Sequence, residues 1–138
     1  MIDSYSNTSQ EVVAGGNIYF AINNIQTGCT ATHSAGSTTF SLNKPGFYFI
    51  TFNGTGAITG ATAGTIIVSM LNNGTLIPGA TASVSSASTT DVRSLAFSKL
   101  IQVKPSCCAV NNTTNLTFNN AGLAATFTNV NVVITKIA

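Results

Sequence analysis

The apolar residues of this chain come in short runs that Gly, Asn and Pro interrupt. No stretch repeats its apolar residues at the spacing of an amphipathic helix, and runs of about four to eight residues are typical of sandwich strands. We therefore predict an all-β fold, a sandwich or jelly roll. The expected strands span residues 17–22, 38–42, 46–53, 64–71, 75–77, 92–103, 107–110, 115–118 and 129–137, with 81–90 as an exposed strand or a loop.

The expected strand at 46–53 is apolar on both of its faces. Side chains alternate along a strand, so Phe47 and Phe49 point one way while Tyr48, Ile50 and Phe52 point the other. A sandwich strand with one wet face alternates apolar and polar residues instead. The pattern predicts that one face packs on the partner sheet. The other face would be covered by another layer or another copy of the chain, or by loops of the same chain.

Charged residues are few, at 6% of the chain, while hydrophobic residues make up 44%. Disordered chains combine low hydrophobicity with high charge, so this composition predicts a folded domain. Thr, Ser, Asn and Gly supply its polar surface in place of ions. Because a surface with so few charges resists self-association poorly, we expect a permanent oligomer.

The formal net charge is +2, and the five basic residues are scattered along the sequence. A nucleic-acid or anionic-membrane partner requires a cluster or stripe of basic residues, so we expect neither. No apolar run approaches the roughly 18 residues that cross a membrane, so we expect no membrane insertion. The basic residues are Lys44, Arg93, Lys99, Lys104 and Lys136.

The chain divides by composition into a polar N-terminal arm at residues 1–16 and one domain at residues 17–138. Its first residues lack the basic segment and continuous apolar stretch of a signal peptide. We therefore expect synthesis and retention in a cytosol, or release by lysis.

Three cysteines, an odd number, do not form a paired disulfide framework. We interpret Cys29, Cys107 and Cys108 as small buried side chains in a reducing compartment. The alternative, a disulfide from Cys29 to one of the other two, stays open. Their spacing and the presence of one histidine predict no metal site.

The sequence contains no recognisable catalytic motif. His33 is the single histidine, and it lies in a Thr/Ser/Ala/Gly segment that predicts a solvated loop. A nucleophilic triad or a carboxylate pair would need partners that the sequence does not place near it. The Gly-rich segment 54–64 lacks the Lys-Ser/Thr of a phosphate-binding loop. We predict no enzymatic activity and no cofactor.

Several segments resemble the tumour-necrosis-factor-like jelly roll. The segment Lys-Pro-Gly-Phe-Tyr-Phe at 44–49 is similar to a family strand that begins with Pro-Gly-aromatic-Tyr. Segments 68–74 and 76–79 are similar to the strand, Asn-Gly turn and short return that follow. Segments 101–112 and 130–138 are similar to the last strands. That superfamily includes the globular heads of the first complement component and the tips of bacterial collagen-like spore glycoproteins.

The resemblance implies a ten-stranded jelly roll packed as a homotrimer, with aromatic side chains near the threefold axis. By position, the interface candidates are Tyr48, Phe49, Phe52 and Phe127. Which face of the strand at 46–53 points to the axis stays open. The collagen repeat of those relatives does not occur in this sequence.

These inferences favour a structural protein of a virion, assembled in the host cytoplasm: a bacteriophage capsid decoration protein, head fibre or fibre-tip knob. Its partners would be copies of itself and a capsid or fibre protein docked by residues 1–16. One alternative is a bacterial spore or cell-surface protein of the collagen-tip type. Another is a module that binds cell-surface glycans or receptors, with candidate loop residues Asn23, Asn24, His33, Asn111 and Asn112, although asparagines in loops often only make turns.

Overall fold

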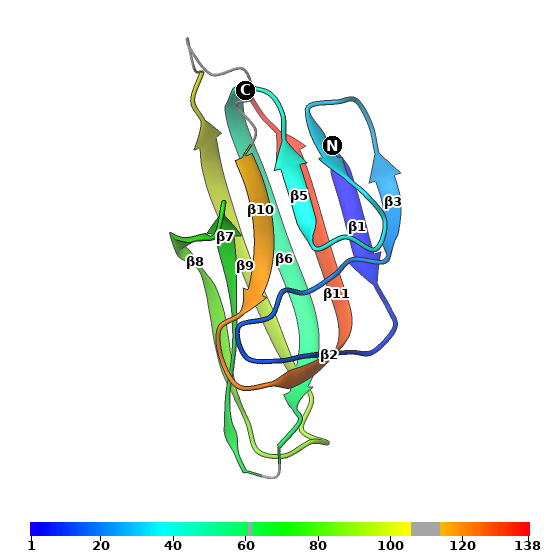
Figure 1. The fold of residues 1–138 in the computed structure, drawn as a ribbon, viewed down its shortest axis with the longest axis vertical. Coiled ribbons are helices and arrows are strands. Elements are labelled where there is room, and N and C mark those ends of the chain that lie inside the picture. Colours follow the sequence, from blue (N-terminus) through cyan, green and yellow to red (C-terminus); the bar gives the residue numbers. More distant parts are fainter. Residues whose placement is uncertain (61, 106–113) are drawn as a thin grey trace.

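The computed structural model describes residues 1–60, 62–105 and 114–138. Over these ranges the chain forms two antiparallel β-sheets packed face to face and no helix (Figure 1). Accordingly, no helix of the described chain could cross a membrane. The all-β prediction is confirmed.

The first sheet has the strand order β3-β1-β11-β6-β9, and β2 pairs with the far end of β11. The central strand β11 pairs with β1 on one side and with β6 on the other. The strands of this sheet are β1 (Ile2–Ser6), β2 (Gln10–Val12), β3 (Ile22–Gln26), β6 (Gly46–Ile58), β9 (Arg93–Val103) and β11 (Ala125–Lys136).

The second sheet has the order β4-β5-β10-β7-β8. Its strands are β4 (Ala31–His33), β5 (Thr39–Leu42), β7 (Gly64–Asn72), β8 (Thr75–Ser86) and β10 (Thr114–Asn120). The β7–β8 hairpin turns at Asn73 and Gly74, whose φ angles are +50° and +84°. The sequence predicted this turn because Asn-Gly tolerates two consecutive positive φ angles.

The core lies between the sheets and centres on aromatic rings. The ring of Phe118 on β10 lies 5.4 Å from that of Phe52, 5.7 Å from that of Phe20 and 5.8 Å from that of Phe40, between ring centroids. All four side chains are buried. Offset and edge-on pairs at these separations add to the free energy gained from burial.

The alternation along β6 decides which of its faces is internal. Tyr48, Ile50 and Phe52 are at most 1% exposed, whereas Phe47 and Phe49 are 40% and 43% exposed. The strand is therefore apolar on both faces, as predicted, but the single chain covers only one of them.

Residues 1–16 do not form a loose arm, so that prediction is wrong. β1 lies between β3 and β11, and β2 pairs with β11. The segment looked polar because serines occupy inward positions. Ser6 Oγ, for example, donates to the carbonyl of Tyr19 and accepts the N–H of Ala21. A buried hydroxyl with partners costs little, so small polar residues can lie in the core.

Several strand boundaries also differ from expectation. The described residues contain eleven strands where ten were expected. The expected strand at 17–22 does not form: Ile22 begins β3, Asn17 makes a single bridge with Asn119, and the residues between them contribute buried Ile18 and Phe20. Segment 81–86 is part of β8, and the expected strand at 107–110 lies outside the described residues.

The sandwich is closed without a second chain. Its accessible surface is 6667 Å², about the 6,700 Å² that surface scaling gives for a compact monomer of 14.1 kDa. The chain is therefore compactly folded, and loose packing does not explain why Phe47 and Phe49 on β6 are exposed.

Phe52→Ala tests the assignment of this ring to the core. We expect it to lower the free energy of unfolding by about 3–5 kcal/mol, because the cavity would leave the rings of Phe97 and Phe118 without a neighbour. Ser83→Ala, at an exposed position of β8, should change it by less than about 0.5 kcal/mol. Urea unfolding at one fixed protein concentration measures both, and equal effects would contradict the assignment.

Candidate functional site

The outer face of the first sheet carries a group of exposed apolar side chains. We define the apolar patch as Phe47 and Phe49 on β6, Leu100 on β9, and Val133 and Ile137 at the end of β11. Four of the five are 40–57% exposed, and Val133 is partly buried. Clusters of this kind on a soluble protein mark contacts with another molecule.

Strand register brings these residues together. Phe49 lies opposite Leu100 on β9 and opposite Thr135 on β11. The N–H of Ile137 donates to the carbonyl of Phe47 over 2.8 Å, which continues the pairing. Residues that lie opposite each other in an antiparallel pair share a face, with Cβ atoms about 5 Å apart. The apolar patch therefore crosses three neighbouring strands.

A carboxylate lies on the same face beside the apolar patch, and its hydrogen bonds are satisfied. Asp3 on β1 pairs with Val133. Its Oδ1 accepts from Nδ2 of Asn131 over 2.7 Å, and its Oδ2 accepts from Nδ2 of Asn24 over 2.9 Å. Because both oxygens have partners, a molecule that covers this face would not leave Asp3 without hydrogen bonds.

The structure corrects three of the four predicted interface residues. Tyr48, Phe52 and Phe127 are at most 1% exposed in the single chain, and a side chain without exposed surface cannot contact a second copy. They belong to the core because their parity on β6 and β11 points between the sheets. Phe49 has the opposite parity and lies in the apolar patch, where its contact with another copy remains a prediction.

The predicted loop-binding residues that are described lie in strands. Asn23 and Asn24 are on β3 and His33 is on β4, while Asn111 and Asn112 lie outside the described residues. Asn23 accepts a hydrogen bond from Ser4 Oγ over 2.6 Å and donates to the carbonyl of His33 over 2.7 Å. These side chains bind neighbouring strands of the chain itself.

His33 is not a solvated loop residue, because it is 4% exposed and stacks on Phe40 with ring centroids 4.2 Å apart. Its Nε2 donates to the carbonyl of Ser37 over 2.9 Å, and its Nδ1 lies 2.6 Å from Asn23 Oδ1. Burial disfavours the charged ring and lowers the pKa of His33, and the Ser37 bond opposes this with a smaller effect.

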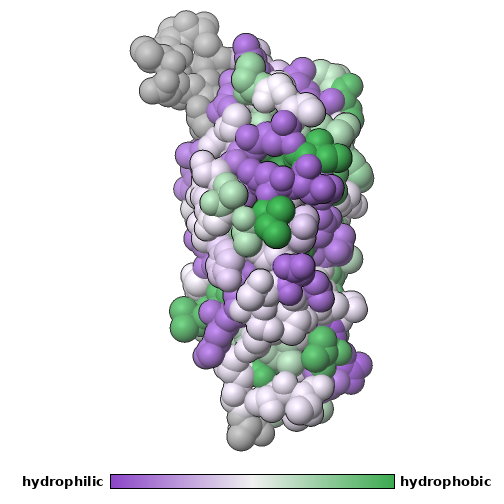
Figure 2. Space-filling model, turned by 90° about the vertical axis from the view of Figure 1, so that its right-hand side faces the viewer, coloured by the Kyte–Doolittle hydropathy of each residue, from purple (hydrophilic) through white to green (hydrophobic). Residues whose placement is uncertain are grey.

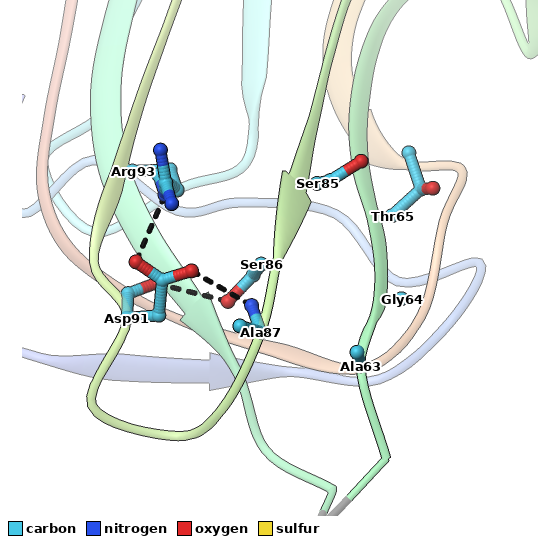
Figure 3. Close-up of a pocket in the computed structure, with 8 residues that line it drawn as sticks. All are labelled: Ala63, Gly64, Thr65, Ser85, Ser86, Ala87, Asp91 and Arg93. Atoms are coloured by element: carbon cyan, nitrogen blue, oxygen red, sulfur yellow. Dashed lines mark hydrogen bonds and ion pairs between the residues drawn. The ribbon is translucent and has the colours of Figure 1, made fainter.

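A hollow of about 370 Å³ (Figure 3) lies at the opposite end of the sandwich from the ends of β9 and β11 (Figure 1). Asp91 Oδ1 accepts from Arg93 Nε over 2.8 Å, and its Oδ2 accepts from the N–H of Ala87 over 2.7 Å. These bonds hold the pKa of Asp91 below its ordinary value, the Ala87 N–H most strongly. The lining residues are Ala63, Gly64, Thr65, Ser85, Ser86, Ala87, Asp91 and Arg93.

The side chains that line this hollow hold the connection between β8 and β9 in place. Buried Ser86 donates to the carbonyl of Asp91 over 2.9 Å, so its hydroxyl and the Asp91 carboxylate both hold the loop in place. The Asp91 carboxylate is committed to the Ala87 N–H and Arg93. In the described part of the chain, no three His, Cys, Asp or Glu residues gather as metal ligands.

Other exposed apolar residues are scattered. Figure 2 shows the side of the molecule that carries β1 and β3, where hydrophobic residues form separate spots among hydrophilic and neutral ones. Cys29 is exposed in the β3–β4 connection, so its predicted burial is wrong. Cys107 and Cys108 lie outside the described residues.

The buried ring of His33 should make stability depend on pH. Its folded-state pKa lies below the ordinary value of 6.5, so the unfolded chain takes up the proton first as the pH falls. The stability that the neutral ring contributes is present above about pH 6.5 and is lost below it. Urea unfolding at pH 7.5 and 5.5 should show this loss, and His33→Gln should reduce it. An equal loss in the variant would contradict this role.

Comparison with known proteins gives a likeness in structure alone. No protein-family model and no curated protein sequence matches the chain. Murine APRIL at pH 5.0 aligns with a TM-score of 0.63 and 8% identity, over 99% of this chain and 98% of that one. The globular domain of zebrafish complement 1qA gives 0.57 and 6%, over 95% and 92%.

A phage protein is also similar. The PRD1 vertex protein P5 aligns with a TM-score of 0.56 and 17% identity, over 99% of this chain and 96% of that one. Identities this low establish the fold and nothing finer. The predicted resemblance is therefore confirmed for the architecture: the chain is a jelly-roll sandwich of the tumour-necrosis-factor-like and complement globular-head type.

Proposed function

We propose that this protein is a non-enzymatic, homotrimeric structural protein of a bacteriophage virion, a capsid decoration protein, head fibre or fibre-tip knob. The apolar patch is the observation that supports self-association. Its five side chains lie together on the outer face of a closed sandwich, where water would otherwise solvate them. Removing that surface from water is favourable by roughly 25 cal/mol per Å² of apolar area.

A second copy of the chain suits the apolar patch for two reasons. The patch and the sheet face around it contain one acidic group, Asp3, and its oxygens already have partners. The chain as a whole has few charges, so copies repel one another little. If this face contacts a different surface of the next copy, and the rotation that relates neighbouring copies returns to the first copy after a full turn, the copies form a closed ring. The likeness to the complement and tumour-necrosis-factor type of fold favours three copies in that ring.

The virion role is supported by the fold shared with the PRD1 vertex protein P5, over nearly the full length of both chains. The glycan-binding alternative loses support, because Asn23 and His33 are engaged inside the chain and the exposed Asn24 donates its amide to Asp3. Docking by a flexible arm at residues 1–16 is excluded by the pairing of β1 and β2 within the sheet.

Phe49→Asp tests the proposed trimer. The wild-type protein should have a mass of about 42 kDa by light scattering, three times the 14.1 kDa of one chain. The variant should elute as a folded single chain, because an unpaired charge in a dry contact is strongly unfavourable. Val13→Asp, at an exposed apolar position outside the strands, should leave the mass at 42 kDa. A 14 kDa wild-type protein at high concentration would overturn the proposal.

The virion assignment is tested on particles released from the cells that make the protein. Gold-labelled antibodies against the chain should decorate purified phage particles in electron micrographs, at capsid vertices, on the capsid surface or at fibre tips. Particles from a deletion of the gene provide the control. Label found on spores or cell walls and absent from particles would favour the bacterial surface alternative.

A further inference from the structure

The fold gathers basic residues that are far apart in the sequence. We define the lysine end as the end of the sandwich where β5, β9 and β11 stop and β6 begins (Figure 1). Lys44, Lys104 and Lys136 are exposed there. Gly46 pairs with Val103, so Lys44 and Lys104 lie just beyond one strand pair. A Cβ built on Gly46 would lie 2.9 Å from Lys136 Nζ, so this ammonium lies over the same pair.

Two of the three acidic side chains lie at the other end of the sandwich. Asp91 and Glu11 belong to the β8–β9 connection and to β2, near the opposite end of the sandwich (Figure 1). Asp3 lies nearer the lysine end, on the outer face of the first sheet opposite Val133, and both of its carboxylate oxygens are bonded to amides. Arg93, far from the lysine end, is paired with Asp91. A chain with a net charge of only +2 is therefore polarised along its length.

The surface between these lysines has a mixed character. Phe47 and Ile137 of the apolar patch reach this end and are 40% and 57% exposed. The residues that line a hollow beside them are Met1, Thr27, Gly28, Thr30, Thr135, Lys136, Ile137 and Ala138. Because the proposed trimer contact covers Phe47 and Ile137, this end offers its ammonium groups and hydroxyls to a further partner.

We propose that the lysine end binds an acidic surface of a partner protein. Carboxylates of the partner would meet the ammonium groups, and its polar groups would hydrogen-bond to the threonine hydroxyls beside Lys136. Nucleic acid fits less well, because no arginine lies at this end among the described residues and the lysines alternate with apolar groups in place of a continuous basic stripe.

The copy number and the viral nature of the partner rest on the proposed function, whereas the charge separation does not. In a trimer, three lysine ends on one side would bind a symmetric acidic surface together, and linked weak contacts gain avidity. Contacts between exposed charges weaken as salt screens them, so the interaction should depend on ionic strength.

The test separates the position of the charges from their number. Lys44→Gln/Lys136→Gln removes two positive charges from the lysine end. Thr62→Glu/Thr89→Glu adds two negative charges at exposed positions of the opposite end, so the net charge changes equally. The probe is a fluorescein-labelled decaglutamate peptide, measured by fluorescence anisotropy at low salt, and a labelled ten-residue oligothymidylate is tested beside it. Light scattering gives the mass of each variant.

We expect decaglutamate to bind the wild-type protein, and the lysine variant to bind it about tenfold more weakly. The threonine variant should bind within about twofold of wild type, since it leaves the ammonium groups in place. Equal losses in both variants, or no loss in either, would overturn the proposal, as would binding of the oligothymidylate alone. A single-chain mass would refute the trimer while leaving the comparison between the variants readable.

Discussion

The contact between Phe52 on β6 and Phe118 on β10 joins the two sheets, and the rest of the structure follows from the parity that it sets. The two rings stack with centroids 5.4 Å apart and an interplanar angle of 19°. Because side chains alternate along a strand, fixing Phe52 inside places Phe47 and Phe49 outside. A shift of one residue would exchange the two sets, so the core and the apolar patch are consequences of one register.

The sequence predicted the sheet architecture better than it predicted the surface. Runs such as 46–53 and 64–71 became β6 and β7 because their β-branched and aromatic residues fit a pleated sheet. The likeness to the tumour-necrosis-factor-like fold was read from the order of such segments. Parity could not be settled in the same way, because a strand that is apolar on both faces gives no internal indication of which face is covered. The interface predictions of Tyr48 and Phe52 were wrong for that reason, whereas Phe127, on β11, was placed at the interface from the resemblance alone.

Two other features depended on contacts between distant residues. The segment at 1–16 was predicted to be an arm because its composition is polar, although the hydroxyls of Ser4 and Ser6 bind Asn23 and the main chain inside the fold. The lysines looked scattered because antiparallel strands bring positions 44, 104 and 136 to one end only after the sheets form. Burial of His33 likewise depends on Phe40 and Ser37, which a local pattern does not place around it.

The interactions that stabilise the fold differ in kind from those by which its surface would bind a partner. Buried polar side chains such as Gln10 and Asn120 tie loops to the main chain through uncharged hydrogen bonds. The ion pair between Asp91 and Arg93 lies at the surface and is partly exposed, where such pairs contribute little. Raising the ionic strength should therefore change the free energy of unfolding of the sandwich little. A strong dependence of binding on ionic strength would consequently report on the surface charges, above all those of the lysine end.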